Sequence, residues 1–250
     1  MHLARWKLLL CLRAEINLSS NFPLYQGQAG IMDNNGIIAR EGYPFIAYSA
    51  GLTVLLTLAA LKLQSTVLGV PAVISLLLTI FVISFFRNPE RTPPGDEKSV
   101  VAPADGTVIV VERVPETPLG TEALKISIFM SVFNVHVNRA PLDGRVVDIA
   151  YHPGRFLDAR DGRASSENER NAVVLEMASG VRIAFVQIAG LIARRIICYP
   201  RIGDTLVRGT RYGLIRFGSR VDVYLPADVE PLVKLGDTTT AGETVLGRIG

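Results

Sequence analysis

The sequence predicts a mainly β protein in which an N-terminal apolar helical hairpin precedes a β-sandwich or barrel-sandwich-hybrid-like domain. Two apolar stretches of about 20 residues lie close together in the first third of the chain. Short runs rich in β-branched residues follow, each bounded by turn-forming residues. A Gly-Asp-Thr turn motif occurs twice among these runs. Together these observations favour one β domain with a helical appendage.

Residues 1–40 carry no periodic pattern, and we expect a poorly ordered N-terminal extension. The apolar run from Leu8 to Leu12 is too short for the core of a signal peptide, and Arg13 interrupts it. Met32 opens a stretch that would itself make a plausible start, so the sequence leaves open whether residues 1–31 are translated.

Residues 41–90 are expected to form a membrane-associated helical hairpin. The apolar stretches 44–63 and 66–86 each match the thickness of a hydrocarbon core, and only Gln64 and Ser65 separate them. Positive charges before and after the hairpin place both of its ends in the cytoplasm by the positive-inside tendency; they are Arg40, Arg87, Arg91 and Lys98. Shallow insertion without spanning, or a buried hairpin in a soluble protein, are the alternatives.

Residues 98–250 are expected to form the β domain, because the periodicity changes from long apolar runs to short ones after a proline-rich break. The predicted strands are 107–114, 124–129, 146–151, 172–177, 181–186 and 221–225. The repeated motif combines Gly203-Asp204-Thr205 with Gly209, and Gly236-Asp237-Thr238 with Gly242. Such turns suit a compact β-sandwich hybrid, since glycine adopts a positive φ without steric cost.

Composition narrows the classes of function. The formal net charge is +3, without the dense basic stripe of a nucleic-acid binder, and this mild balance suits an anionic phospholipid surface. Cys11 and Cys198 stand far apart and without metal-ligand spacing, so we expect neither a disulfide framework nor a zinc site. No other cluster of His, Cys and carboxylates has ligand spacing, and we expect no metal.

Histidine is scarce, and only His136 and His152 fall within the β domain. His136 alternates with Asn134 and Asn138 at the end of an apolar strand, so the three should share one face. A hydrogen-bonded structural role for His136 remains an alternative. His152 lies at a Pro-Gly turn, which is more typical of a solvated or structural histidine.

Asp105 and Ser219 carry weak signals by themselves. Asp105 precedes a glycine and a strand, which is ordinarily a turn, although it could orient His136 and stabilise the imidazolium. Ser219 follows Gly218 directly before a strand, and Gly-Ser is a common turn dipeptide. Both residues become informative only in combination with the surrounding motifs.

That combination resembles the phosphatidylserine decarboxylases, and especially the short bacterial and archaeal-like form of this pyruvoyl-dependent family. The resemblance covers about residues 32–250, and as a set its motifs are highly specific. They are APADG (102–106), FNVHVNRAP (133–141), YHPGRF (151–156), SSENERN (165–171), VQIAGLIARRI (186–196) and RFGSRVDVYLP (216–226).

The resemblance implies a proenzyme that cleaves itself between Gly218 and Ser219, giving a β chain (1–218) and an α chain (219–250). Asp105, His136 and Ser219 would form the triad for this reaction, with His136 taking the Ser219 proton. The serine oxygen would attack the Gly218 carbonyl to give an ester. Elimination and hydrolysis would then convert Ser219 into a pyruvoyl group.

In the mature enzyme, the resemblance implies that the substrate amine forms a Schiff base with this covalent pyruvoyl cofactor. Loss of carbon dioxide would convert phosphatidylserine into phosphatidylethanolamine. The expected partners are the lipid in the cell membrane, reached from the cytoplasmic face, and the protein's own cleavage products as a heterodimer. Higher oligomers stay open, and no nucleic acid is expected.

One departure from the family leaves the proton donor at Cα open. Longer members have a second histidine three residues before the triad histidine, and here that position is Phe133. His136, Asn134, Asn138 or a bound water are the alternatives. The candidate substrate-binding residues are Phe133, Asn138, Arg195 and Arg216, with Arg194 and Arg220 as further candidates for the lipid phosphate or carboxylate.

The sequence is also compatible with three rival interpretations. A membrane-anchored carrier of the lipoyl type would need a modifiable lysine, and Lys234 is the one available near the second Gly-Asp turn. A serine hydrolase would use Ser219 and His136 without cleaving the chain. A decarboxylase of an ether-linked phosphoserine lipid would share every head-group motif.

Overall fold

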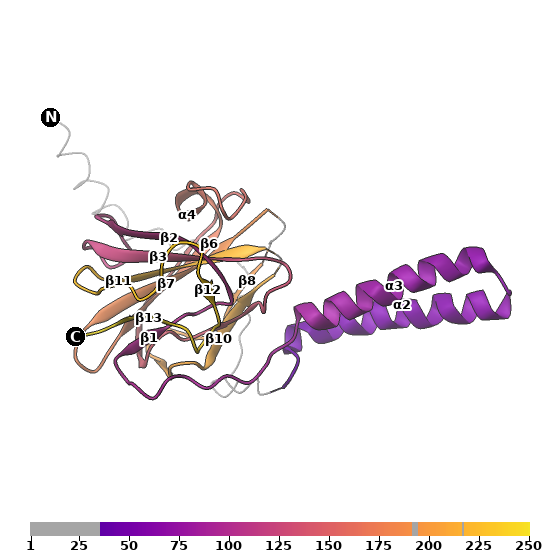
Figure 1. The fold of residues 1–250 in the computed structure, drawn as a ribbon, viewed down its shortest axis with the longest axis horizontal. Helices are drawn as coiled ribbons and strands as arrows, with labels where there is room; N and C mark the ends of the chain where they lie inside the picture. Colours follow the sequence, from indigo (N-terminus) through magenta and orange to yellow (C-terminus); the bar gives the residue numbers. More distant parts are fainter. Residues whose placement is uncertain (1–35, 192–194, 217) are drawn as a thin grey trace, which may run out of the picture. The chain divides into compact units, whose positions relative to one another are not determined.

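The computed structural model describes residues 36–191, 195–216 and 218–250. The chain is mainly β, as predicted, and two long helices precede the strands (Figure 1). A 3-10 turn, η2 (Arg40–Gly42), leads into α2 (Tyr43–Lys62), which α3 (Thr66–Phe85) follows. These bounds agree with the predicted apolar stretches to within one residue.

The two helices are joined by a tight connection. Gln64 adopts a positive φ of 47°, which reverses the chain in little space. The Ser65 hydroxyl then caps α3 by accepting a hydrogen bond from the Leu68 amide at 3.4 Å. Polar side chains also join the two helices to each other. Thr53 Oγ1 of α2 is 2.9 Å from Ser75 Oγ and 3.0 Å from Thr79 Oγ1 of α3.

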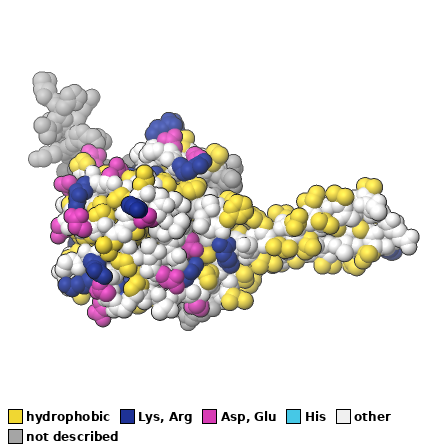
Figure 2. Space-filling model, in the orientation of Figure 1, with side chains coloured by type: hydrophobic (Ala, Val, Ile, Leu, Met, Phe, Trp, Pro, Cys, Tyr) yellow, Lys and Arg dark blue, Asp and Glu magenta, His cyan; other side chains and the backbone are white. Residues whose placement is uncertain are grey.

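Most of the apolar hairpin surface is exposed. No residue of α2 is buried, and α3 buries only Ala72, Ser75, Thr79 and Phe85. Hydrophobic side chains line both helices on the face drawn in Figure 2, whereas charged side chains gather on the β domain. Both helices are long and apolar enough to cross a membrane. A hairpin buried in a soluble core is therefore not what this chain forms.

The β domain centres on an eight-stranded antiparallel sheet that curls into a half-barrel (Figure 1). Its strand order is β12-β2-β3-β11-β7-β6-β5-β9. The strands are β2 (Gly106–Val114), β3 (Ala123–Met130), β5 (Gly144–His152), β6 (Arg170–Glu176), β7 (Arg182–Ala189), β9 (Thr205–Leu206), β11 (Ser219–Pro226) and β12 (Thr238–Thr239). All six predicted strands are present in it.

Two smaller sheets and a short helix complete the described part of the domain. One sheet has the order β4-β10-β8, and the other pairs β1 with β13. These elements are β1 (Ser99–Val101), β4 (Val137–Arg139), β8 (Ile196–Cys198), β10 (Arg211–Ile215), β13 (Val245–Arg248) and α4 (Ala164–Glu167). The sequence did not predict them, because most are too short to show a period.

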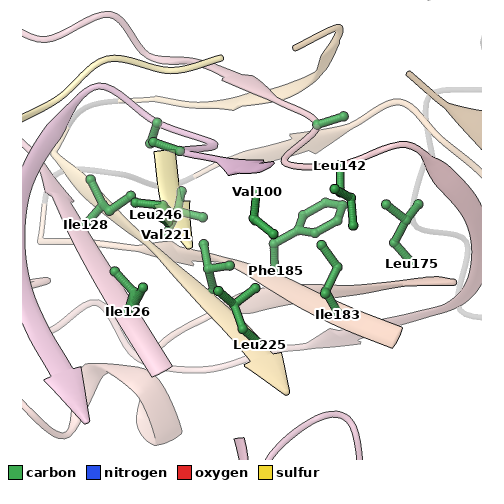
Figure 3. Close-up of a cluster of buried hydrophobic side chains, with 14 of the residues drawn as sticks. Val100, Ile126, Ile128, Leu142, Leu175, Ile183, Phe185, Val221, Leu225 and Leu246 are labelled. Atoms are coloured by element: carbon green, nitrogen blue, oxygen red, sulfur yellow. The ribbon is translucent and has the colours of Figure 1, made fainter. Parts of the chain in front are cut away.

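The main core packs on one face of the sheet, and a smaller cluster packs on the other. Val221 and Leu225 of β11 pack with Phe185 of β7 and Ile126 of β3, and each is fully buried (Figure 3). Complete burial of such side chains contributes roughly 1.5–3 kcal/mol each. The strand that begins at Ser219 therefore runs through the centre of both the sheet and the core.

The two copies of the Gly-Asp-Thr motif make the same pair of backbone hydrogen bonds to a neighbouring strand. Gly236 N donates to Val108 O and Val108 N to Asp237 O, just as Gly203 N donates to Val146 O and Val146 N to Asp204 O, all at 2.8 Å. The motif glycines all have positive φ, with 98° at Gly203, 78° at Gly209, 91° at Gly236 and 80° at Gly242. The repeat thus attaches β12 to β2 and β9 to β5, at opposite edges of the sheet.

Candidate active site

Ser219 lies at the first position of β11, between two neighbouring strands. It pairs with Met130 of β3 on one side and with Ala189 of β7 on the other. The side chain is fully buried, and its hydroxyl donates to the Met130 sulfur at 3.4 Å. A serine in the middle of an eight-stranded sheet has its backbone position set from both sides.

The backbone before Ser219 depends on two glycines. Gly218 has a φ of +59°, a conformation that residues with a side chain rarely adopt. Its carbonyl oxygen lies so close to Gly190 that a Cβ at position 190 would be 2.2 Å from it. The Gly218 carbonyl can therefore take this position only because residue 190 has no side chain.

His136 is held as a neutral imidazole with one nitrogen unused. Its Nδ1 is 2.9 Å from the Asn134 carbonyl oxygen, which can only accept, so Nδ1 carries the proton. Nε2 then holds a lone pair and is buried without a hydrogen-bond partner in the described part of the chain. The ring is 1% exposed and packs on Phe85, with centroids 3.9 Å apart.

Burial lowers the pKa of His136 to about 4, because a charged imidazolium would lose its hydration. The Asn134 carbonyl raises this pKa in part, and the charge of Arg87 lowers it further. The imidazole is thus neutral at pH 7. A neutral ring with a free Nε2 lone pair can accept a proton.

Asp105 is engaged by other partners. One carboxylate oxygen is 3.1 Å from Arg91 Nη2, and the other accepts the Ala241 amide at 2.8 Å. Neither contact is to His136, whose ring is oriented by the Asn134 carbonyl. Orientation of His136 by Asp105 stays a prediction.

Asn138 is fully buried, and its side chain and that of Ser219 both donate to the Met130 sulfur. Its Nδ2 donates to the Met130 sulfur at 3.7 Å, and its Oδ1 accepts from Gln187 Nε2 at 2.9 Å. Sequence reasoning missed Met130 and Gln187. A single glutamine within the apolar strand VQIAG was the one available signal for Gln187.

The other predicted substrate-binding residues lie where the hairpin meets the β domain. Phe133 is 75% exposed and packs edge-to-face on Phe81 of α3, with centroids 6.3 Å apart. The Arg216 guanidinium lies 5.1 Å from the ring centre of Phe45 in α2, and its backbone amide donates to the Arg195 carbonyl at 3.2 Å. Burial and the charge of Arg195 both lower the pKa of Arg216.

Arg194 and Arg220 are the two further candidates for binding the lipid head group. Arg194 lies outside the described residues. Arg220 is 1% exposed, with its guanidinium bonded to Asp222 and to two serine hydroxyls. Its charge is thus paired inside the protein, and a contact of Arg220 with the lipid stays a prediction.

Within residues 36–191, 195–216 and 218–250, no group of three or more His, Cys, Asp or Glu side chains could hold a metal ion. Cys198 is a free thiol there, and burial raises its pKa to about 12. Its thiol is therefore protonated at neutral pH and a poor nucleophile.

The fold and the site define a mainly β enzyme domain with a buried serine and a neutral histidine, attached to a pair of apolar helices. The sequence model of the phosphatidylserine decarboxylase family matches residues 78–247 of this chain. The chain therefore belongs to the phosphatidylserine decarboxylase family.

Three relatives described as phosphatidylserine decarboxylase proenzymes illustrate the similarity. The Pelobacter propionicus protein is 67% identical over 87% of this chain and 99% of its own length. The Trichlorobacter lovleyi protein is 62% identical, again over 87% and 99% of the two chains. The Geobacter sulfurreducens protein is 58% identical over 86% of this chain and 98% of its own. The chain is thus a member of a family of decarboxylases made as proenzymes.

Proposed function

We propose that this chain cleaves itself at Gly218-Ser219 and then decarboxylates phosphatidylserine to phosphatidylethanolamine, using a pyruvoyl group made from Ser219. The names of the relatives support the substrate and the proenzyme state. The observation that supports this cleavage site is the left-handed Gly218 backbone, whose carbonyl lies against Gly190 directly before a fully buried serine.

The proposed cleavage proceeds in balanced steps. Ser219 Oγ loses its proton and attacks the Gly218 carbonyl carbon, and the bond from that carbon to the Ser219 nitrogen breaks to give an ester with a free amine. Loss of the Ser219 α-proton expels Gly218 as a carboxylate and leaves a dehydroalanine. Addition of water and loss of ammonia then give the pyruvoyl group.

His136 is the proposed base for the first proton. Its Nδ1 proton is held by the Asn134 carbonyl, which directs the lone pair to Nε2. The low pKa of His136 keeps that lone pair unprotonated at neutral pH, and it also makes the imidazole a weaker base than a solvated histidine. The Ser219 hydroxyl donates to the Met130 sulfur, a weak acceptor, and makes no hydrogen bond to His136 Nε2, so the proposed transfer requires the hydroxyl to leave the sulfur and turn to the imidazole. Asp105 as the third member of the triad is supported by the resemblance alone.

The surroundings of Ser219 suit a pyruvoyl group at this position. The keto oxygen would take the place of the Ser219 amine, and a methyl group would take the place of its hydroxymethyl side chain, in a buried position between β3 and β7. The group would supply the electron sink that decarboxylation at an α-carbon requires. Asn138 contacts the same Met130 sulfur as the Ser219 hydroxyl, and its buried amide could orient the substrate.

The hairpin base is the proposed entry for the lipid. Phe133, exposed and packed on α3, would contact acyl chains or the interface, while Arg195 and Arg216 would bind the phosphate or carboxylate of the head group. Residues 41–90 would anchor the protein in the cell membrane with the catalytic domain, 98–250, on the cytoplasmic face.

After cleavage, the α chain (219–250) and the β chain (1–218) would remain a heterodimer. β11 belongs to the α chain, and both of its neighbours in the sheet, β3 and β7, belong to the β chain. The apolar residues of β11 are fully buried among theirs, so separation would expose a core.

The intact masses of the purified protein and of its Ser219→Ala variant, measured in denaturant, test the proposal. We expect two chains split after Gly218, the smaller reacting with a carbonyl-directed hydrazide, and a single unlabelled chain from the variant. One uncut chain from folded wild-type protein would overturn the mechanism. Reaction with an acyl-enzyme probe would then favour the hydrolase, and added mass on Lys234 would favour the carrier.

The processed enzyme should release carbon dioxide from phosphatidylserine in detergent micelles. A matched ether-linked phosphoserine lipid separates the two decarboxylase interpretations. A clear preference for the ether lipid would replace the proposed substrate while keeping the chemistry.

A further inference from the structure

The segment from Leu157 to Asn168 lies against the Gly218-Ser219 bond, and the proposed chemistry gives it no role. It includes α4 and the first part of the SSENERN motif. Ala159 in this segment is 2% exposed, and its Cβ would be 3.3 Å from a Cβ placed on Gly190. Ala159 therefore borders the position of the Gly218 carbonyl.

Asn168 binds this segment to β7 through hydrogen bonds beside the proposed cleavage site. It is fully buried, and its Oδ1 accepts the Leu157 amide at 2.9 Å. Its Nδ2 donates to the Leu157 carbonyl at 2.9 Å and to the Ala189 carbonyl at 2.8 Å. Ala189 is the residue that pairs with Ser219 and precedes Gly190. One amide thus joins both ends of the segment to the strand that borders the scissile bond.

Ser165 binds the same segment to β11, on the Ser219 side of the Gly218-Ser219 bond, through Arg220 and Asp222. Its hydroxyl donates to Asp222 Oδ2 at 2.8 Å and accepts from Arg220 Nη2 at 2.7 Å. The same nitrogen donates to Ser127 Oγ at 2.8 Å, and Arg220 Nε bonds to Asp222. Arg220 follows Ser219 directly, so this buried network limits movement of the chain immediately after the nucleophile.

We propose that Ser165 and Asn168 are positioning residues for the self-cleavage reaction. The inference rests on the proposed function. Asn168 acts through Ala189 on the Gly218 side, and Ser165 acts through Arg220 on the Ser219 side. Attack of a serine on the preceding carbonyl requires a strained approach, and its rate depends on how well the two atoms are held.

The same contacts cross the new chain junction once cleavage has occurred. Arg220 and Asp222 then belong to the α chain, and Ser127 and Ser165 to the β chain. The network therefore also holds residue 219 in place after its peptide bond to Gly218 is lost.

The test compares Ser165→Ala with Ser166→Ala in the full-length protein, made by cell-free translation into lipid nanodiscs. Ser166 is the neighbouring serine, and its hydroxyl bonds only locally, to the Arg163 carbonyl at 3.1 Å. We expect Ser165→Ala to slow cleavage about tenfold, the rate equivalent of one hydrogen bond to a charged group. Ser166→Ala should cleave at the wild-type rate, and Ser165→Thr, which keeps the hydroxyl, should recover most of the loss.

Asn168→Asp tests the other side of the bond. It keeps an acceptor for the Leu157 amide and removes the donor to the Leu157 and Ala189 carbonyls, so cleavage should slow by a similar factor. To separate positioning from folding, the same substitutions are placed in the uncleavable Ser219→Ala chain, and the urea midpoints are measured. Arg211→Lys serves as the stability control, because it alters a buried arginine bonded to Asn88 and Glu90.

The inference is supported if Ser165→Ala and Asn168→Asp slow cleavage more than Arg211→Lys does. The comparison is made at an equal decrease of the urea midpoint. Wild-type cleavage rates, equal effects at Ser165 and Ser166, or a loss that only follows the midpoint would each overturn it. Should Ser219→Ala itself be cleaved, the proposed function fails instead, so the two failures are distinguishable.

Discussion

The protonation state of His136 follows from its burial and can be tested by the pH dependence of cleavage. A base with a pKa of about 4 remains neutral down to mildly acidic pH. We therefore expect the initial cleavage rate in nanodiscs to be nearly constant from pH 8 to about pH 5.5. A rate that halves near pH 6.5 would instead indicate a solvated histidine and contradict the buried base.

The same pKa predicts a stability effect with a definite sign. The folded-state pKa of His136 is about 4, below the model-compound value of 6.5, so the unfolded chain takes up the proton first on acidification. Stability is complete above about pH 6.5 and decreases as the pH falls toward 4. The loss at pH 5 should be about 2 kcal/mol. Urea unfolding of Ser219→Ala at pH 7 and pH 5 measures it, and His136→Asn should reduce the difference.

Gly190 is a second residue with a direct test. An alanine there would place its Cβ 2.2 Å from the Gly218 carbonyl oxygen, so the reacting carbonyl must move. We expect Gly190→Ala to abolish most cleavage while the chain still folds. Gly144→Ala is the control, because its Cβ would meet the Glu176 carbonyl at 2.7 Å, away from Ser219. Equal cleavage in the two variants would contradict the role of this close contact.

At the scale of elements, the sequence predicted what local pattern determines. The helices were predicted because spans are recognised from length and apolarity alone, and the six strands because each is long enough to alternate. β4 and β10 pair across distant parts of the chain, and no local period marks them. At the site, the Gly218-Ser219 pair and His136 were identifiable from motifs. Met130 and Gly190 matter only through contacts that the fold creates.

The hairpin predicts a membrane-binding test. Leu55 and Leu77 are 64% and 61% exposed on α2 and α3, and an arginine at the centre of a span costs about 2.5–3.5 kcal/mol by insertion measurements. The double variant Leu55→Arg/Leu77→Arg should be extracted from membranes by alkaline carbonate. Leu235→Arg is the control, since Leu235 is 69% exposed on the β domain, and it should stay with the membrane fraction as wild type does. Retention of the double variant would argue against insertion of the hairpin.

At the scale of the whole molecule, the proposed cleavage would change the number of chains that unfolding produces. The uncut chain unfolds to one product, whereas the mature protein would release the α and β chains, because no disulfide is expected to join them. β11 is held between β3 and β7, so the two chains should elute together from gel filtration under native conditions. Its buried Val221 and Leu225 should keep the chains together until the sheet itself unfolds.

The midpoint of urea unfolding should therefore depend on protein concentration for the mature enzyme and not for Ser219→Ala, since separated chains recombine by mass action. A tenfold rise in concentration adds about 1.4 kcal/mol to the apparent stability of a dissociating pair. Equal midpoints for the mature protein across that range would show that unfolding does not separate the chains. Loss of the α chain on gel filtration would show that β11 is not enough to hold it.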